Sequence, residues 1–593
     1  MSFASLRSAR QSKESRSFVK PFPEITEQSP TSPETTQSSS KNKATSLQTP
    51  LAPTAVDLQS LHTALPDFLD VRQSSERGRG IYSKSTHKPG TVLLAVKPHA
   101  AVLSTPYLDS YCSFCCGPTP SAGLKRCTRC KTVWYCDHKC QSDDWPSHKN
   151  ECSALQKWAS TAPSQDVSIP SDVIRCLGRI LWTQCEKGSS DHWSKEINMM
   201  QSHRSTLPPS AFQSHTHIAH SLVKYLGVSS PMELEPYGIH NSADLVDIIS
   251  RVTTNAFTLT SFSLTPIGIA VSPTVALANH SCEPNAVVVF PRSASNPQVQ
   301  EPLMNVVAIK PIRPSDEILT AYIDVTLPRE QRQKALKDTY NFTCECTLCA
   351  KTSSADPRAT TWCPKSCGGT CPVPTEEDPL TRCVKCKAAV SSTDAVLDAI
   401  RIGQEALDKA VSIQYIDPAK AKQLTTNMIP ILTAAQLTPS CHPLLAMTRL
   451  HQEFLVASLS ASLSQELLDD TIRTAGKYSA GLSAILPPGH PVRGVALAEL
   501  GKLLAVDEPS PFAGVRANGQ QFPPSGPARL KLAYETLVHA RDELVVGFGG
   551  KNEGGMVGKE VRETIVRFET ELGVWKSGIK NVLEDANGVS TKK

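Results

Sequence analysis

The chain has 593 residues, of which 40% are hydrophobic and 20% are charged, and its formal net charge is +5. A single hydrophobic core does not extend over this length, so we expect several domains. The small net charge gives no reason to predict nucleic-acid binding. Because the sequence has no run of about 18 uninterrupted apolar residues and no apolar stretch followed by a cleavage site near its start, we expect neither a membrane span nor a secretory signal.

The first 60 residues form a polar segment. They are rich in Ser, Thr, Gln, Pro and Lys and poor in apolar residues, so they cannot bury enough surface to offset the entropy lost on ordering. We therefore predict a disordered tail over residues 1–60. Arginines spaced among serines also occur in mitochondrial presequences, but Glu14 and the long polar continuation favour a plain tail. We expect the protein in the nucleus, the cytoplasm or both.

Short apolar runs broken by Gly and Pro follow the tail. The run Val92–Val96, preceded by the turn residues Lys88-Pro89-Gly90, is typical of strands joined by tight turns, which we predict over residues 66–111. Residues 153–250 carry apolar side chains at helical spacing. Residues 251–330 form a second β-rich block.

Amphipathic stretches dominate the last third of the chain, over residues 391–593. Residues 396–411 and 561–575 are examples, and they predict long helices. Helix pairs of the tetratricopeptide type fit this pattern, although the repeats follow no strict period.

The 20 cysteines occur mostly in short pairs. Without a secretory signal we expect reduced thiols, and CxC, CxxC and CxxxC spacings are typical of zinc sites. Within residues 112–152, four spaced pairs supply seven thiols and one imidazole, and these eight side chains are the number of ligands that two tetrahedral zinc ions need. These ligands are Cys112, Cys115, Cys127, Cys130, Cys136, Cys140, His148 and Cys152.

This cysteine-rich stretch resembles the MYND finger, including Tyr135 before Cys136 and Trp145 ahead of His148. In that family the ligand pairs interleave. The resemblance therefore implies a first ion held by Cys112, Cys115, Cys136 and Cys140, and a second held by Cys127, Cys130, His148 and Cys152. Cys116 is a spare neighbour. The resemblance also implies a finger surface that binds proline-rich peptides.

Three separated motifs lie outside the finger. Arg77–Ile81 reads Arg-Gly-Arg-Gly-Ile, Asn279–Asn285 reads Asn-His-Ser-Cys-Glu-Pro-Asn, and Asp316–Tyr322 precedes a further group of cysteines. Their order and content resemble a SET domain with its post-SET segment. With the finger inserted after the first strands, the chain resembles the SET and MYND domain-containing (SMYD-like) family of protein-lysine methyltransferases. The resemblance is close over residues 68–386 and loose in the helical C-terminus.

The resemblance implies methyl transfer from S-adenosylmethionine to a lysine amine. This reaction is an in-line displacement, so the enzyme mainly positions the reactants and excludes water. Free lysine has a pKa of about 10.4, so its amine must first lose a proton, and an apolar, aromatic-lined channel favours the neutral amine. By resemblance, the Tyr322 hydroxyl lies at the point of methyl transfer and Tyr340 lines the lysine channel.

The resemblance also implies six cofactor-binding residues. These are Arg77, Arg79, Asn255, Asn279, His280 and Phe342. Asn279 and His280 would hold the amino-acid end and the adenine, while Arg77 and Arg79 would lie on the loop over the methionine moiety. Phe342 would stack near the adenine, and Asn255 matches another cofactor-facing position. Taken alone, the two arginines could equally be solvated turn charges, and Asn255 could be a polar group at a strand edge.

Two further cysteine groups lie in and near residues 331–390. The resemblance implies a third zinc ion held by Cys282, Cys344, Cys346 and Cys349, which would fix the segment carrying Tyr340 and Phe342 over the active site. Cys363, Cys367, Cys383 and Cys386 could form a fourth site, with Cys371 left over.

One departure from the family pattern is visible. The family often has Gly-Glu-Glu before the catalytic strand, whereas this chain has Ser315-Asp316-Glu317. Loss of the glycine matters only if that turn requires a positive φ, and we expect the activity to be intact.

We therefore predict an α+β multidomain protein. Its parts, listed by residue, are a β-rich SET fold (66–111, a helical insertion at 153–250, and 251–330) interrupted by a MYND zinc finger (112–152), a post-SET cysteine-rich zinc segment (331–390), and an all-α tetratricopeptide-like C-terminal domain (391–593).

The function predicted from these parts is S-adenosylmethionine-dependent methylation of lysines in histone tails or other proteins. The alternative is a weakly active or inactive scaffold that binds partners through the finger and the C-terminal helices. The intact Tyr322 and Asn279-His280 favour the enzyme. DNA binding by the finger is disfavoured, because MYND spacing lacks the long helix that enters a major groove. We expect no membrane partner and no direct nucleic-acid partner.

Overall fold

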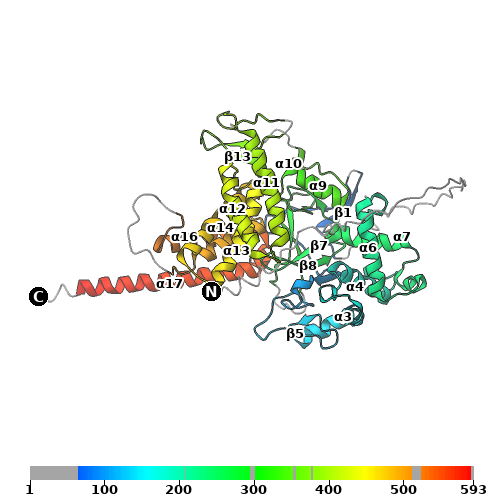
Figure 1. Ribbon diagram of the computed structural model, residues 1–593. Coiled ribbons are helices and arrows are strands. Elements are labelled where there is room, and N and C mark those ends of the chain that lie inside the picture. Colours follow the sequence, from blue (N-terminus) through cyan, green and yellow to red (C-terminus); the bar gives the residue numbers. More distant parts are fainter. Residues whose placement is uncertain are drawn as a thin grey trace.

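The computed structural model describes residues 64–75, 77–207, 209–293, 301–350, 356–375, 378–390, 392–509 and 522–588. The tail predicted over residues 1–60 lies outside these residues. Figure 1 shows a centre of short strands, with the helices of residues 138–255 on one side and those of residues 393–588 on the other. Among the described helices, none is long and apolar enough to cross a membrane.

The strands are short and pair mostly antiparallel. Their bounds are β1 (Leu69–Ser74), β2 (Gly78–Ser83), β3 (Val92–Val96), β4 (Ala100–Leu103), β5 (Lys125–Arg126), β6 (Trp134–Tyr135), β7 (Ala256–Thr260), β8 (Pro266–Val271), β9 (Asn279–His280), β10 (Ala286–Val289), β11 (Met304–Ala308), β12 (Leu319–Thr320), β13 (Thr360–Trp362) and β14 (Thr370–Pro372). Two three-stranded sheets have the orders β10-β11-β3 and β4-β8-β7, and β9 pairs in parallel with β12.

The sheet β10-β11-β3 lies between two hydrophobic cores. Alternate residues of a strand point to opposite faces, and in β11 the side chains of Met304, Val306 and Ala308 join a core that also includes the cysteine-rich finger. Val307, with Val287 of β10, joins a second core built mainly from C-terminal helices. Both faces of this sheet are therefore covered, which explains why every residue of β11 is buried.

The helices between the finger and the second β-rich block pack together beside the sheet β4-β8-β7, and α4 lies directly against β4 and β8. They are α3 (His138–Thr161), α4 (Asp172–Lys187), α5 (His192–Met199), α6 (Pro209–Leu226) and α7 (Ser242–Asn255). The apolar side chains at helical spacing in α4, such as Leu177 and Leu181, pack with Ile269 and Val271 of β8. The helix α3 begins inside the cysteine-rich stretch, where the Asp137 side chain caps it by accepting from the Cys140 N–H.

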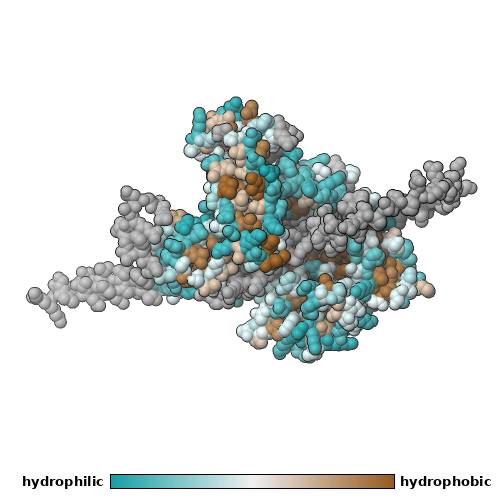
Figure 2. Space-filling view, in the orientation of Figure 1, coloured by the Kyte–Doolittle hydropathy of each residue, from teal (hydrophilic) through white to brown (hydrophobic). Residues whose placement is uncertain are grey.

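Helices make up most of the rest of the chain. Their bounds are α9 (Arg329–Tyr340), α10 (Thr347–Ala350), α11 (Thr393–Ile413), α12 (Pro418–Ala434), α13 (His442–Ala461), α14 (Gln465–Ile485), α15 (Pro491–Leu504), α16 (Pro527–Gly547) and α17 (Gly555–Gly588). From α11 onward, consecutive helices pack against one another, and α16 also packs against β11. Figure 2 shows apolar side chains at the surface of these helices; Ile402 in α11 and Ile431 in α12 are exposed.

Candidate active site and metal centres

A cleft of about 1300 Å³ lies between the β-rich part of the chain and the C-terminal helices. All eight residues predicted to act in catalysis or cofactor binding line it: Arg77, Arg79, Asn255, Asn279, His280, Tyr322, Tyr340 and Phe342. The opposite wall comes from α11, α13, α14 and α15, through residues such as Leu407, Arg449 and Tyr478. The structure therefore brings together residues that lie up to 265 positions apart, from Arg77 to Phe342.

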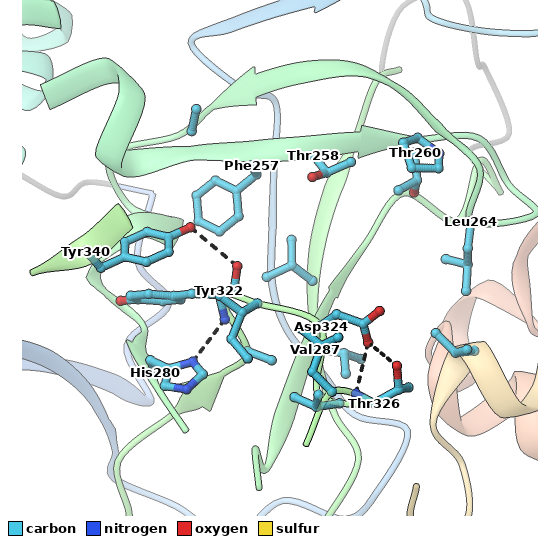
Figure 3. A pocket seen from close by; sticks show the side chains of 18 of the residues that line it. Phe257, Thr258, Thr260, Leu264, His280, Val287, Tyr322, Asp324, Thr326 and Tyr340 are labelled. Carbon is cyan, nitrogen blue, oxygen red and sulfur yellow. Dashed lines mark hydrogen bonds between the residues drawn. The ribbon is translucent and has the colours of Figure 1, made fainter. Parts of the chain in front are cut away.

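The rings of Tyr322, Tyr340 and His280 lie side by side in the cleft (Figure 3), and the ring of Phe342 lies next to that of His280. The ring centroids of Tyr322 and Tyr340 are 5.0 Å apart, and those of His280 and Tyr322 are 5.3 Å apart. Phe342 lies 5.9 Å from His280 by the same measure. The parallel pairing of β9 with β12, in which His280 faces Thr320, brings the second and third sequence motifs side by side.

The hydroxyl of Tyr322 is held in place by the backbone. It donates to the carbonyl oxygen of Ala278 at 2.9 Å, and the Tyr322 N–H donates to Nδ1 of His280 at 3.0 Å. The Tyr340 hydroxyl donates to the carbonyl oxygen of Tyr322 at 3.3 Å. Burial, together with the nearby Tyr340 and Glu317, raises the pKa of Tyr322 above its ordinary value, and burial raises the pKa of Tyr340 to about 12. Both hydroxyls therefore remain protonated donors at neutral pH.

Asn279 is oriented by the first and third motifs. Its amide Nδ2 donates to the carbonyl oxygen of Arg79 at 3.0 Å and to Oε1 of Glu317 at 2.8 Å. Oε2 of Glu317 pairs with the exposed guanidinium of Arg77 at 3.3 Å. Sequence reasoning included Glu317 in a motif without giving it a role, and only its partners in space reveal that role.

Arg79 and Asn255 line the cleft but also fix the chain segment after α5. Arg79 donates to the carbonyl oxygen of Met199, and burial, together with Arg251, lowers its pKa from the ordinary value. The amide of Asn255 donates to the carbonyl oxygens of Gln201 and Arg251, at 2.8 Å each. These contacts give both residues a positioning role for the wall of the cleft.

The turn before β12 does use a positive φ. Ser315 has φ +71°, a conformation that glycine adopts more easily than serine. The Ser315 N–H donates to the carbonyl oxygen of Ser83 at 2.7 Å, which ties this turn to β2 despite the missing glycine.

Four groups of side chains in the described residues are arranged to hold a metal ion. Within each group the ligand atoms lie within 4.8 Å of one another. The groups are Cys112, Cys115, Cys136 and Cys140; Cys127, Cys130, His148 and Cys152; Cys282, Cys344, Cys346 and Cys349; and Cys363, Cys367, Cys383 and Cys386. These are the four sets predicted from the sequence. Thiolates and one imidazole in sets of four are the donors that structural zinc prefers.

A buried ionic network supports the second of these groups. Nδ1 of His148 lies 3.1 Å from Oε2 of Glu151, and the same carboxylate accepts from Arg175 at 3.2 Å and from Arg179 at 2.5 Å. Arg179 also pairs with Asp144 at 3.1 Å. A carboxylate behind a ligating imidazole fixes the orientation of the ring. Sequence reasoning missed this network, although Glu151 immediately before Cys152, three residues after His148, is a local signal for it.

The third group lies directly beneath the aromatic cluster. Sγ of Cys282 lies 4.0 Å from Sγ of Cys344 and 3.5 Å from that of Cys349. Nε2 of His280 lies 3.3 Å from Sγ of Cys282. Since Nδ1 of His280 accepts from the Tyr322 N–H, the ring proton is assigned to Nε2, which points at the sulfur.

The chain is similar to a known zinc-finger family and to known lysine methyltransferases. The family model of the MYND finger matches residues 111–152. N-lysine methyltransferase SMYD2-B of Xenopus laevis is 31% identical over 301 residues, covering 49% of this chain and 63% of that protein. N-lysine methyltransferase SMYD2 of Homo sapiens is 32% identical over 281 residues, covering 46% and 59%. These matches confirm the resemblance predicted from the motifs, and the chain spans about three fifths of the length of these relatives.

A solved structure, the SET domain of LSMT bound to lysine and AdoHcy, also matches. It is 10% identical and covers 87% of this chain and 90% of that chain, with a TM-score of 0.28. A score this low supports no argument about the fold or the ligands.

Proposed function

We propose that this protein is an S-adenosylmethionine-dependent protein-lysine N-methyltransferase. The observation that carries the proposal is the aromatic cluster of Tyr322, Tyr340, His280 and Phe342 in the cleft, adjoining the oriented amide of Asn279. The relatives described above are N-lysine methyltransferases, which supports the same reaction. In this proposal the β-rich part has a SET fold, and the C-terminal helices pack in the tetratricopeptide-like manner.

The residues of the cleft fit the needs of this reaction. Bound S-adenosylmethionine would supply a methyl group on a positively charged sulfonium. The Asn279 amide and the backbone around Arg79 and His280 would hold its polar end, and Phe342 would contact the adenine. The rings of Tyr322 and Tyr340 exclude water from the lysine side chain, and this desolvation favours the neutral amine that attacks. The hydroxyl of Tyr322, fixed by Ala278, orients the reacting atoms without titrating.

The substrates in this proposal are proteins with an accessible lysine, in histone tails or elsewhere, and the protein acts in the nucleus, the cytoplasm or both. The finger would bind proline-rich peptides and bring partners to the cleft. The three zinc ions implied by the resemblance would be structural, because each predicted ligand set is complete and leaves no open position for catalysis.

A transfer assay with the full chain tests the proposal. Zinc-replete protein is incubated with labelled S-adenosylmethionine, a mixture of histones and a cell extract, and cofactor binding is measured separately by calorimetry. We expect label on protein lysines and a measurable cofactor affinity. Protein that binds no cofactor and labels no acceptor would rule out the enzyme and leave the scaffold.

The close approach of Gly80 to Asn279 and Glu317 gives a sharper prediction for the cofactor end of the cleft. A Cβ at Gly80 would lie 2.6 Å from Oε1 of Glu317 and 3.0 Å from Nδ2 of Asn279. In Gly80→Ala the flexible Glu317 side chain must move away, so Asn279 loses its charged acceptor. Hydrogen bonds to charged groups contribute about 1.5–3 kcal/mol, so we expect cofactor affinity to fall roughly tenfold or more.

Calorimetry with S-adenosylmethionine measures this change. Gly573→Ala is the matched control, because a Cβ there meets nothing within 4 Å. Equal affinities for the two variants would show that the Asn279–Glu317 contact does not organise the cofactor site.

A further inference from the structure

The fourth cysteine group lies outside the cleft and outside the finger. Sγ of Cys363 is 3.4 Å from Sγ of Cys386, and Sγ of Cys367 is 3.5 Å from that of Cys383. Four sulfurs around one zinc at about 2.3 Å are separated by about 3.8 Å. The sulfur separations in the finger and in the Cys282 group, between 3.5 and 4.0 Å, fall in the same range.

The second half of this group repeats a turn from the MYND finger. Arg382-Cys383-Val384-Lys385-Cys386-Lys387 has the same pattern of residue types as Arg126-Cys127-Thr128-Arg129-Cys130-Lys131. The final lysine has a positive φ in both turns, +60° at Lys387 and +55° at Lys131. Its N–H donates to the carbonyl oxygen of the first cysteine at 3.0 Å in both.

Further hydrogen bonds complete the match between the two turns. The N–H of the first cysteine donates to a carbonyl oxygen just after the turn. Cys383 donates to that of Ala388 at 2.8 Å, and Cys127 donates to that of Val133 at 2.9 Å. The arginine before that cysteine donates to the carbonyl oxygen of the final lysine in both turns. The finger turn holds two ligands of a predicted zinc site, so the copy at 382–387 is built to do the same.

The first half of the group is shaped for close contact with these sulfurs. Gly369 lies so near them that a Cβ there would be 2.8 Å from Sγ of Cys383 and 3.4 Å from that of Cys367. The N–H of Cys363 donates to the carbonyl oxygen of Gly369 at 3.0 Å. Among the described residues of this segment, the apolar core consists of Cys363, Cys371 and Cys383 with a few partly buried neighbours, which is too little to fold it without a cross-link.

The segment is attached on one side to the C-terminal helices. The Trp362 N–H donates to the carbonyl oxygen of Gln436 at 2.7 Å, and the Thr438 N–H donates to that of Thr360 at 3.1 Å. On the other side, Nε of Arg358 donates to the carbonyl oxygen of Val325 at 2.6 Å, and Val325 lines the cleft.

We propose that Cys363, Cys367, Cys383 and Cys386 bind a fourth, structural zinc ion, which folds residues 356–375 and 378–390 into a clamp between the wall of the cleft and the loop joining α12 to α13. The four thiols close a tetrahedral site with no open position, so the ion takes no part in chemistry. The buried Cys371 stays outside the ligand set as part of the small core.

Metal analysis of the purified full chain tests this proposal. We expect four zinc equivalents per chain in the wild type and three in Cys383→Ser/Cys386→Ser. Cys185→Ser, which removes an exposed thiol outside the four groups, is the control and should keep four. A wild-type content of three, or an unchanged content in the double variant, would overturn the proposal.

Two further measurements separate zinc binding from a cross-link by disulfides and from general misfolding. Thiol titration of denatured, unreduced wild type should detect all 20 cysteines, and a deficit of four confined to this group would mean disulfides instead. In the double variant, amide exchange should accelerate in residues 356–390 and at 436–438, while that in α3 stays unchanged. If the double variant cannot be recovered, the zinc content of the wild type alone decides.

Discussion

Tyr322→Phe is expected to lower kcat roughly 100-fold, the range found when a positioned acid–base or donor group is removed. The substitution keeps the ring, which contacts Tyr340 and His280, and removes the hydroxyl that donates to Ala278. Cofactor affinity should change by less than about threefold, or under 1 kcal/mol, because the hydroxyl does not contact Asn279. The assay is transfer from labelled S-adenosylmethionine, with calorimetry for the cofactor.

The matched control is Tyr534→Phe, which removes a hydroxyl that donates a hydrogen bond to Glu569 and does not line the cleft. It should leave both quantities unchanged. The raised pKa of Tyr322 means that its hydroxyl does not ionise near neutral pH, so the activity that remains in Tyr322→Phe should show the same pH dependence as the wild type. A variant with full kcat, or with a shifted profile, would contradict the assigned role.

Arg179→Leu is expected to lower the local free energy of unfolding around the finger by about 3–5 kcal/mol, as when one partner of a buried ion pair is removed. Arg179 is buried and binds both Asp144 and Glu151, which are buried as well. Without it, two carboxylates lose their main counter-charge, and Glu151 can no longer orient His148 firmly. Amide exchange in α3 and α4 and the rate of zinc loss to a chelator measure the effect.

An exposed arginine with a similar set of partners provides the control. Arg401 pairs with Asp398 and Glu405 on the surface of α11, and exposed pairs contribute little. We expect Arg401→Leu to change neither exchange nor zinc loss measurably. Equal behaviour of the two variants would show that the network at Arg179 does not support the finger.

The local parts of the site were accessible from the sequence. Ligand pairs separated by one to three residues share one turn, so the cysteine spacing predicted the zinc ligands. The assignment of those ligands to the first three ions came from the resemblance, and the structure brings the same sets together. The cleft residues came instead from the resemblance, since no periodicity connects Arg77 with Phe342. The partners of the zinc ligand His148 could not be predicted from the sequence, because Arg179 lies 28 residues from Glu151 and a lone arginine in a sequence is usually a solvated charge.

Two other features also depended on the fold. Ser315 has a positive φ and donates a hydrogen bond to Ser83, a residue far away in the sequence. The wall of the cleft formed by α11 and α13–α15 arises because residues far along the chain fold back over the strands. Amphipathic periodicity predicts that such helices exist, but it does not reveal which surface they cover.

The sheet β10-β11-β3 has a consequence for how the protein can be divided. Residues such as Val287 and Val307 face the C-terminal helices, and their neighbours Met304 and Val306 face the finger side. A shortened protein that stops near residue 390 would expose this apolar sheet face to solvent, and we expect it to aggregate for that reason. The change in composition near residue 390 is therefore a poor place to divide the protein. The two parts differ in composition, but each depends on the other for its stability, and we expect them to fold only when they are produced together.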